Sequence, residues 1–460
     1  MRKCNKHILW LLAMTPLVGN AQNSGDGKGI FSDITPADVT ATAKLTMPQK
    51  WTFTDCMNYA IANSTEVRRS LLSILQADEN VGAAKDEWLP TVGFSTNQSF
   101  TNYPVSTEGR TSNAYGSSYG VNASWTVWEG NVRKYRLESA KLQRQQQFLA
   151  GDDAVKDITL GVLSAYLNIM YAQETVEIAR QTLEVSTSQT QRAKRLMESG
   201  RTSKVDYAQI ESQMAQDQYS LTQAESNLAT AKMNMKKILN LGLDYDLEID
   251  RPSLSDSEIS VSLPAMKQTY DLAAAWLPGI KSNEISKEVY ANDIKIAKAG
   301  NLPNIALQGG VGTGYNSGGK SWGWQMGHGL NENVGLSLSV PIYDGNATRR
   351  AVAKAKLASL DYDITREELL NNLSQTIENL YVDANNAKAK YESGVKQLEA
   401  TQMTADLVNR QFELGLVNPL ELLTAHNNLL NARLELLQSK FMAILSNKTI
   451  SYYATSNVTL

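Results

Sequence analysis

Residues 412–425 read Phe-Glu-Leu-Gly-Leu-Val-Asn-Pro-Leu-Glu-Leu-Leu-Thr-Ala, and this stretch has the features of a turn between two helices. Gly415 stands where a glycine commonly ends a helix in the left-handed conformation. Asn418 is a favoured N-cap residue, Pro419 suits the first helical position, and Glu421 completes a capping-box pattern. The stretch therefore predicts a tight turn between two antiparallel helices.

The same pattern occurs 215 residues earlier in the chain. There Gly200 is the helix-ending glycine, Ser203 is the N-cap residue, and Asp206 is the acid of the capping box. Ser203 and Lys204 stand where the second turn has asparagine and proline. Because the two tips differ chemically, we expect them to do different jobs.

Most of the chain is a tandem duplication, which is the first property to establish in a long sequence. Leu89-Pro90 reappears 213 positions later as Leu302-Pro303, and Gly130-Asn131 reappears 215 positions later as Gly345-Asn346. The offset then stays at 215 through both turns. The second copy therefore has two extra residues between these landmarks, and because insertions concentrate in exposed loops, we expect a loop there.

The N-terminal residues predict export. Basic residues, an apolar run and small residues at the cleavage positions predict a signal peptide over 1–21. Residues 22–50 contain much Gly, Asp, Thr and Ser, and we interpret them as a flexible extension. The first repeat is then expected at 51–250 and the second at 251–460. The mature chain keeps one cysteine, Cys56, so packing or assembly must stabilise it without an internal disulfide.

Alternating residues predict two strands in each repeat. The alternation is clearest in 121–127 and 334–342, and weaker in 92–100 and 305–311. A period of two indicates strands with one apolar face. Stretches of about ten such residues suit tilted strands that cross a bilayer, and the Trp and Tyr residues around them suit an interfacial girdle. A small soluble sheet is the alternative interpretation.

Four strands are too few for a closed barrel, since known transmembrane barrels start at about eight. An open edge in hydrocarbon would leave backbone groups unpaired. If these strands span a membrane, the protein must therefore be an oligomer. We expect loops at 103–118 and 316–331, which are rich in Gly, Ser, Thr and Asn.

The remaining sequence has apolar residues at spacings of three and four, which predicts coiled-coil helices. One apolar stripe precedes each turn and another follows it, so each repeat is expected to form a long helical hairpin. A helix from about 131 to 199 would be about 100 Å long at 1.5 Å per residue, which suits a rod or tube. After the signal peptide no apolar run approaches the ~20 residues of a spanning helix.

The sequence gives little support for nucleic-acid binding or catalysis. A net charge of −3 is spread along the chain without a basic patch. His7, His328 and His426 have no metal-ligand companion at i+4, and no nucleophile motif occurs. The acids of the segment 244–250 lack the glycine and the terminal glutamate of a calcium loop. We therefore expect no enzyme activity, no cofactor and no nucleic-acid partner.

Several of these features together resemble the TolC-like outer membrane efflux family, also called outer membrane factors. The resemblance runs from about Trp51 to about Ser446. It rests on the opening motif at 51–57, the Leu-Pro before a strand, the Gly after the second strand, the helical Tyr166 and the tip pattern of 412–421. No single motif is specific to the family, but their order, spacing and duplication together are.

The resemblance implies a mainly α fold with β strands. Long antiparallel coiled-coil hairpins would form an α-barrel, and each chain would give four transmembrane strands to a trimeric, twelve-stranded β-barrel. It implies a passive exit duct of a tripartite efflux or type I secretion system, in the lipid of the cell outer membrane with its helices in the periplasm. A periplasmic adaptor protein and an inner-membrane pump of the RND or ABC type would be its partners.

The resemblance also implies roles for the tips. Glu421 and Asp206 are candidate aperture acids, although helix capping is a sufficient structural explanation for both. Thr424 and Val417 stand where the best-known members have a second acid and a gating arginine. The candidate adaptor contacts are Gly200, Ser203, Lys204, Gly415, Asn418 and Pro419. A non-transporting periplasmic scaffold of coiled-coil rods and a surface adhesin are the alternative functions.

Overall fold

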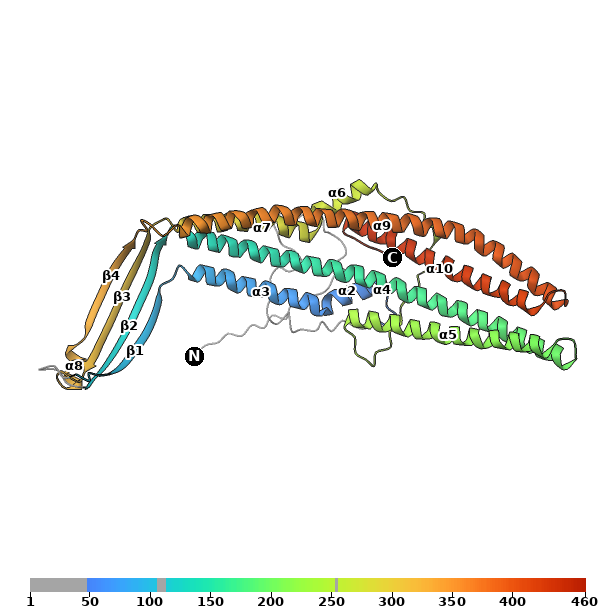
Figure 1. Ribbon diagram of the computed structural model, residues 1–460, viewed down its shortest axis with the longest axis horizontal. Coiled ribbons are helices and arrows are strands. Elements are labelled where there is room, and N and C mark those ends of the chain that lie inside the picture. Colours follow the sequence, from blue (N-terminus) through green and yellow to red (C-terminus); the bar gives the residue numbers. More distant parts are fainter. Residues whose placement is uncertain (1–47, 106–112, 253–254) are drawn as a thin grey trace, which may run out of the picture.

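The computed structural model describes residues 48–105, 113–252 and 255–460. A four-stranded sheet forms one end of an elongated molecule, and long helices run from it to two turns at the other end (Figure 1). The predicted signal peptide and nearly all of the predicted N-terminal extension lie outside the described residues.

The two longest helices confirm the duplication. Helix α4 (Val132–Glu198) and helix α9 (Ala347–Glu413) each have 67 residues, and their ends are 215 positions apart. Each follows a Gly-Asn pair in which both residues have positive φ, 55° for Gly130 and 65° for Asn131. A Cβ on Gly130 would lie 2.9 Å from Leu302 Cδ1. The turn from strand to helix therefore requires glycine for conformation and for space.

Each long helix packs against a returning helix, α5 (Lys204–Leu239) on α4 and α10 (Pro419–Thr455) on α9 (Figure 1). These pairs are the predicted helical hairpins. Nearer the sheet, α3 (Thr65–Asp86) packs on α4, and α7 (Pro278–Ala299) packs on both α4 and α9. Among the described residues, none of the helices combines the length and the apolar character that crossing a membrane requires.

The sheet has four antiparallel strands in sequence order, and β2 of the first repeat pairs with β3 of the second. Strands β1 and β4 are its edges. The strands are β1 (Thr91–Asn102), β2 (Asn113–Glu129), β3 (Asn304–Asn316) and β4 (Asn331–Ser339).

The register of the strands separates an apolar face from a polar face. Phe94 pairs with Val121 and Val121 with Val311, and directly opposed residues share a face. We call the first side the apolar face; it comprises Val92, Phe94, Val121, Ala123, Trp125, Ile305, Leu307, Val311, Val334, Leu336 and Leu338. The opposite, polar face carries Ser95, Asn97, Asn122, Ser124, Thr126, Gln308, Asn333 and Ser337. The predicted alternation is confirmed, and every residue of β1 and β4 is exposed in the single chain.

Three details of the strand region differ from the sequence prediction. Strand β2 begins at Asn113, so the loop predicted over 103–118 is too long, because small and polar residues pair with both neighbours. Strand β4 ends at Ser339 rather than near 342, since Pro341 has no N–H for a ladder. The loop predicted at 316–331 contains a short helix, α8 (Trp322–His328).

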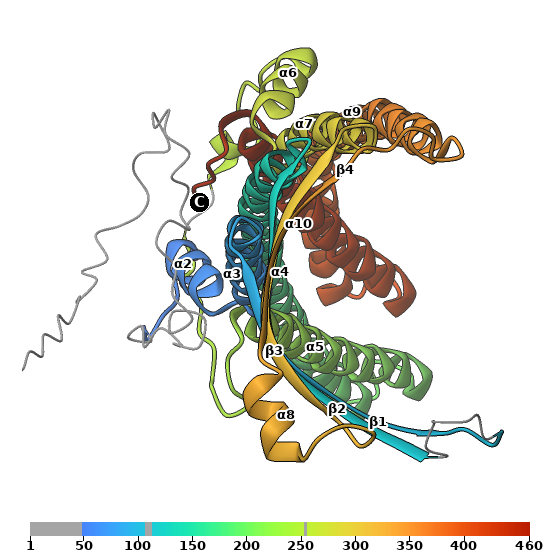
Figure 2. The same cartoon turned by 90° about the vertical axis from the view of Figure 1, so that its left-hand side faces the viewer.

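A belt of short elements surrounds the middle of the long helices, and we call it the girdle. It comprises α2 (Phe53–Asn63), η1 (Asp256–Glu258), α6 (Met266–Trp276) and the segments 48–52, 240–252 and 456–460. Figure 2 shows α2 and α6 on one side of the long helices, the convex side of the molecule. The girdle and the helices beneath it contain the largest cluster of buried apolar residues.

Trp51 is the most tightly held residue of the girdle. Its side chain is fully buried, its ring meets Tyr59 edge-on at 5.0 Å, and its Nε1 donates to the Tyr245 hydroxyl at 2.8 Å. Its backbone N–H donates to the Glu248 carbonyl at 2.9 Å, and its carbonyl accepts from Asp250 at 2.8 Å. The opening motif of the first repeat is therefore bound to the segment that joins the repeats.

Two tyrosines at matching positions connect the long helices to the same joining region. Tyr166 on α4 is buried, and its hydroxyl donates to the Asp250 carbonyl at 2.8 Å. Tyr381 on α9 donates to the Pro264 carbonyl at 2.6 Å. Burial raises the pKa of Tyr166 far above its usual range, so the hydroxyl remains a donor. This shared role explains why a tyrosine occurs at both positions.

Cys56 lies in the same core without a disulfide. Burial, with a smaller contribution from the Asp55 carboxylate, raises the pKa of the Cys56 thiol to about 12. The thiol therefore stays protonated and packs as a small apolar group.

Candidate functional site

Both helical turns lie at the end of the molecule farthest from the sheet (Figure 1). Gly200 and Gly415 have φ values of 74° and 76°, as predicted for helix-ending glycines. After the first glycine, Arg201 N–H donates to the Leu196 carbonyl at 2.8 Å, and the second turn has the matching bond at 2.9 Å. Both turns thus end their helices with the same pair of backbone bonds.

The caps of the returning helices differ between the turns. At the first turn the Ser203 hydroxyl accepts from Asp206 N–H at 3.0 Å, and the Asp206 carboxylate accepts from Ser203 N–H at 3.3 Å. This complete capping box is confirmed. At the second turn the Asn418 side chain accepts from Glu421 N–H at 2.9 Å.

Only one of the two bonds of the capping box predicted for the second turn is present; the bond from Asn418 N–H to the Glu421 carboxylate is not formed. Within the described residues the Glu421 carboxylate makes no hydrogen bond or ion pair. Glu421 is exposed, so water can satisfy its carboxylate without the rotamer entropy that a fixed side chain loses. Asp206 is thus occupied in a cap, whereas Glu421 presents an unpaired negative charge at the tip.

The surfaces of the two tips also differ. The second tip exposes Leu414, Leu416 and Leu420, each between 66% and 75% exposed. The corresponding positions of the first tip hold Ser199, Arg201 and Val205. Lys204 is exposed beside them, whereas Pro419 at the matching position is buried. The first tip is therefore polar and basic, and the second is mainly apolar with one free acid.

All the tip residues predicted from the sequence lie in these turns, but in two separate groups. Among the described residues no hydrogen bond or ion pair joins the predicted residues of one turn to those of the other. The contacts that join the hairpins lie slightly farther from the tips, where α4 and α5 meet α9 and α10. We call this region the seam.

The seam contains an exposed ion pair and a buried contact between a histidine and an aspartate. Arg192 Nη1 on α4 lies 2.8 Å from Glu413 Oε1 on α9, and both side chains are nearly half exposed. On the inner side, His426 Nε2 of α10 lies 3.3 Å from Asp217 Oδ2 of α5. The Asp217 side chain is only 2% exposed and that of His426 12%. Gln213 completes the group by donating to Asp217 Oδ1 at 2.8 Å.

The contact between Asp217 and His426 was not predicted from the sequence, where His426 was considered only as a possible metal ligand. One signal was available. Asp217 stands between Met214 and Leu221 at the spacing of the apolar stripe on α5. A carboxylate in such a stripe needs a partner when the stripe is buried, because an unpaired buried charge is very costly.

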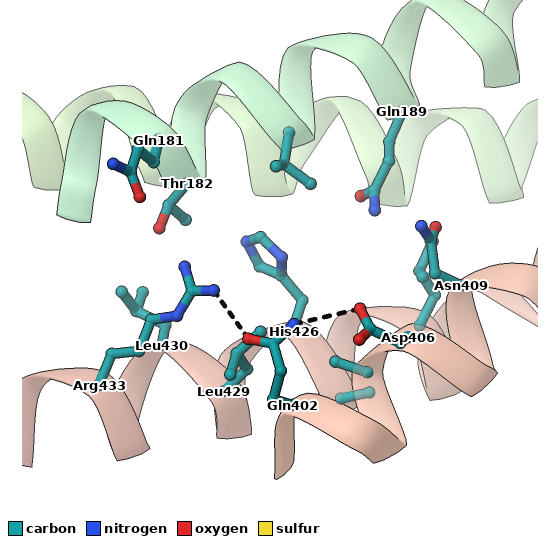
Figure 3. Close-up of a pocket in the computed structure, with 14 residues that line it drawn as sticks. Gln181, Thr182, Gln189, Gln402, Asp406, Asn409, His426, Leu429, Leu430 and Arg433 are labelled. Atoms are coloured by element: carbon teal, nitrogen blue, oxygen red, sulfur yellow. Dashed lines mark hydrogen bonds between the residues drawn. The ribbon is translucent and has the colours of Figure 1, made fainter. Parts of the chain in front are cut away.

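A cavity of about 300 Å³ separates the hairpins beside the His426 side chain. Figure 3 shows Gln181, Thr182 and Gln189 of α4 on one side, and side chains of α9 and α10 on the other. Arg433 donates to the Gln402 side chain at 2.8 Å within the second hairpin. Val185, Leu422 and Leu429 also line the cavity, so the seam is mixed in character and incompletely packed. In the described part of the chain, no group of His, Cys, Asp and Glu side chains is arranged to hold a metal ion.

Comparisons with known proteins agree with this architecture. The family model described as "Outer membrane efflux protein" matches residues 57–241 and 269–442. The outer membrane efflux protein BepC of Brucella suis is 21% identical over 415 residues, which cover 89% of this chain and 85% of that protein. The outer membrane protein TolC of Vibrio cholerae is 24% identical over 338 residues, covering 70% and 74%.

A comparison with solved structures supports the same fold. The outer-membrane channel OprN has a TM-score of 0.71 at 19% identity, with 87% of this chain and 89% of that chain covered. The similarity therefore extends across both repeats, through the sheet, the girdle and the hairpins.

Proposed function

The chain belongs to the outer membrane efflux protein family, and from this premise we propose that it is the outer membrane exit duct of a tripartite efflux or type I secretion system. Members of this family are transport channels rather than enzymes. The observation that carries the proposal is that one chain combines a sheet and very long helices. A sheet with one apolar face adjoins helices about 100 Å long, whose tips can reach far into the periplasm.

The proposed duct is a homotrimer. The sheet has two open edges, β1 and β4, and unpaired backbone groups at such edges cost several kcal/mol each in hydrocarbon. Pairing β1 of one copy with β4 of the next removes every edge. Three copies then make a closed barrel of twelve strands, with the apolar face toward lipid and the polar face toward the lumen.

The proposed partners at the tips are a periplasmic adaptor protein and, through it, an inner-membrane pump of the RND or ABC type. Leu414, Leu416 and Leu420 lie a helix length away from the membrane-crossing sheet, so lipid does not cover them. Clustered exposed apolar side chains favour a protein partner. The polar first tip, with Lys204 and Arg201, offers that partner a different surface.

Membrane fractionation tests the proposed function as a whole. The mature protein should sediment with outer membranes and migrate as a heat-modifiable oligomer on a gel. Recovery as a soluble periplasmic protein would contradict the duct and favour a coiled-coil scaffold.

The proposed aperture acid can be tested by conductance. Glu421→Gln removes the unpaired negative charge at the second tip, so single-channel conductance in planar bilayers should rise and the preference for cations should fall. Asp206→Asn is the matched control, because that carboxylate is engaged in a capping box. Its effect on ion preference should be smaller. Unchanged conductance and ion preference in Glu421→Gln would remove this residue from the aperture.

A further inference from the structure

Helix α8 lies at the end of the sheet that is farthest from the long helices (Figures 1 and 2). It connects β3 to β4, and its side chains bind it to β3. The Thr313 hydroxyl donates to the Met326 carbonyl at 3.0 Å. The Gln325 side chain accepts from Asn316 N–H and donates to the Asn316 carbonyl, both at 2.9 Å. These bonds fix the position of α8 relative to the strand.

The bond from Thr313 also identifies the face of the sheet that α8 covers. Side chains alternate along a strand, so Thr313 points to the same side as Val311 and Leu307. Helix α8 therefore lies over the outer end of the apolar face. Figure 2 agrees, since α8 is on the convex side of the curved sheet, the side on which α2 and α6 lie.

The exposed side chains of this segment combine two indole rings with the ammonium group of Lys320. Trp322 is 56% exposed and Trp324 44%, whereas Gln325 and Met326 are partly buried. Lys320 Nζ lies 3.9 Å from the centre of the Trp324 ring. The His328 ring stacks on that ring at 4.6 Å.

Charge in the segment has one sign. Residues 304–331 contain no Asp or Glu, and Lys320 is their one Lys or Arg. The next acid, Glu332, lies on β4 opposite Val311, so it is an exposed carboxylate at the outer end of the same face of the sheet. Lys320 precedes α8 in the chain, and its ammonium group lies over the ring of the exposed Trp324.

We propose that α8 is a lipid anchor that lies in the headgroup region of the outer leaflet and contacts anionic, phosphate-bearing lipids. This inference rests on the proposed crossing of the membrane by the sheet. The apolar face would be covered by acyl chains, and α8 continues that face at its outer end. Indole rings favour the interface because one edge is polar and the body is apolar. Lys320 beside them matches the negative phosphates.

Depth-dependent quenching tests the anchor in the full-length protein. Gly323→Cys, Leu336→Cys and Ser95→Cys place one reporter on α8, one on the apolar face and one on the polar face; a Cβ at Gly323 meets nothing within 4 Å, and both indole rings are kept. Cys56 is fully buried and should not be labelled. Each variant is labelled with a polarity-sensitive fluorophore and reconstituted in vesicles of phosphatidylcholine with phosphatidylglycerol. Nitroxides near the headgroup, nitroxides deep in the acyl chain and an aqueous quencher then report the depth.

The label at 323 should be quenched most by the nitroxide near the headgroup, and the label at 336 by the deep nitroxide. The label at 95 should respond to the aqueous quencher alone. If 336 is quenched by lipid but 323 only by the aqueous quencher, the anchor is overturned while the crossing of the sheet stands. If 336 escapes lipid quenching, the membrane-crossing sheet itself is overturned.

The charge of the anchor has a separate test in the Gly323→Cys background. Replacing phosphatidylglycerol by phosphatidylcholine should shift the label toward water. Lys320→Gln should produce a similar shift in the anionic vesicles, changing the ratio of immersed to emerged label about fivefold. Ser321→Gln is the matched control at the neighbouring position and should leave the ratio unchanged. Equal immersion in both vesicle types and in Lys320→Gln would overturn the contact with anionic lipid.

Discussion

The girdle and the seam both lie where the two hairpins meet, but they differ in the side chains that form them. In the girdle, aromatic and aliphatic side chains such as Trp51 and Tyr166 are completely buried and make directed bonds to the joining segment. In the seam, polar and apolar side chains together line a cavity of about 300 Å³, and an exposed ion pair and a buried His–Asp contact join the hairpins. The two hairpins are thus packed tightly against each other at the girdle and loosely near the tips.

This difference has a physical consequence for motion. Apolar burial contributes in proportion to the area removed from water, so separating the girdle would expose a large cluster at once. Partly exposed polar contacts exchange with water at small net cost. Local opening therefore has its lowest free energy at the seam, and the tips can separate while the girdle stays folded.

The largest effect should come from breaking the girdle. Trp51→Ala removes a buried ring that packs on Tyr59 and bonds to Tyr245, and it should reduce the free energy of unfolding by about 3–5 kcal/mol. The measurement is the denaturant dependence of the helical circular dichroism signal. Tyr245→Phe is the matched control, because it removes only hydrogen bonds and should cost about 0.5–1.5 kcal/mol. A loss below that of Tyr245→Phe would contradict the central role of Trp51.

An intermediate effect is expected at the buried pair of the seam. His426→Leu removes the imidazole that lies 3.3 Å from Asp217 Oδ2, a contact that is not a hydrogen bond in the structure, and leaves the buried carboxylate with Gln213 alone; we expect a loss of about 1–3 kcal/mol. Hydrogen exchange should therefore quicken in α5 and α10 near the tips, while the girdle stays protected. Channel conductance should rise if the tips separate.

A double variant sharpens this prediction. His426→Leu with Asp217→Leu replaces the whole pair by apolar side chains, which is often neutral or stabilising. Protection near the tips should return toward that of the unchanged protein. Additive losses in the double variant would show that the two side chains act independently.

The sequence predicts one of these two regions much better than the other. The helices α4 and α9 end where Gly200 and Gly415 predicted, because caps and helix-ending glycines are local chemistry. The apolar face of the sheet followed from a period of two. The match between Tyr166 and Tyr381 was visible as a repeat, although their bonds to the joining segment were not.

The remaining features depend on contacts between distant residues. The partner of Asp217 lies 209 positions away on another hairpin, so no local pattern identifies it. The bonds that hold α8 on β3 involve Gln325 in a segment rich in glycine and serine, whose composition predicted only a loop. The predicted bond from Asn418 N–H to the Glu421 carboxylate is wrong because hydration of the carboxylate competes with capping. The exposure of Glu421, which decides that competition, cannot be read from the sequence.

The smallest effect is expected at the exposed contact between Arg192 and Glu413. Their side chains are 43% and 45% exposed, so a double-mutant cycle with Arg192→Ala and Glu413→Ala should give a coupling of about 0.2–1 kcal/mol. The measurement is the free energy of local opening from hydrogen exchange in α9 near the tip. The coupling should vanish at about 1 M salt, where the Debye length is about 3 Å. The buried pair of Asp217 and His426 should keep its coupling there, because buried pairs are screened much less. If both couplings respond equally to salt, the seam is uniformly exposed and its inner side contributes no more than its outer side.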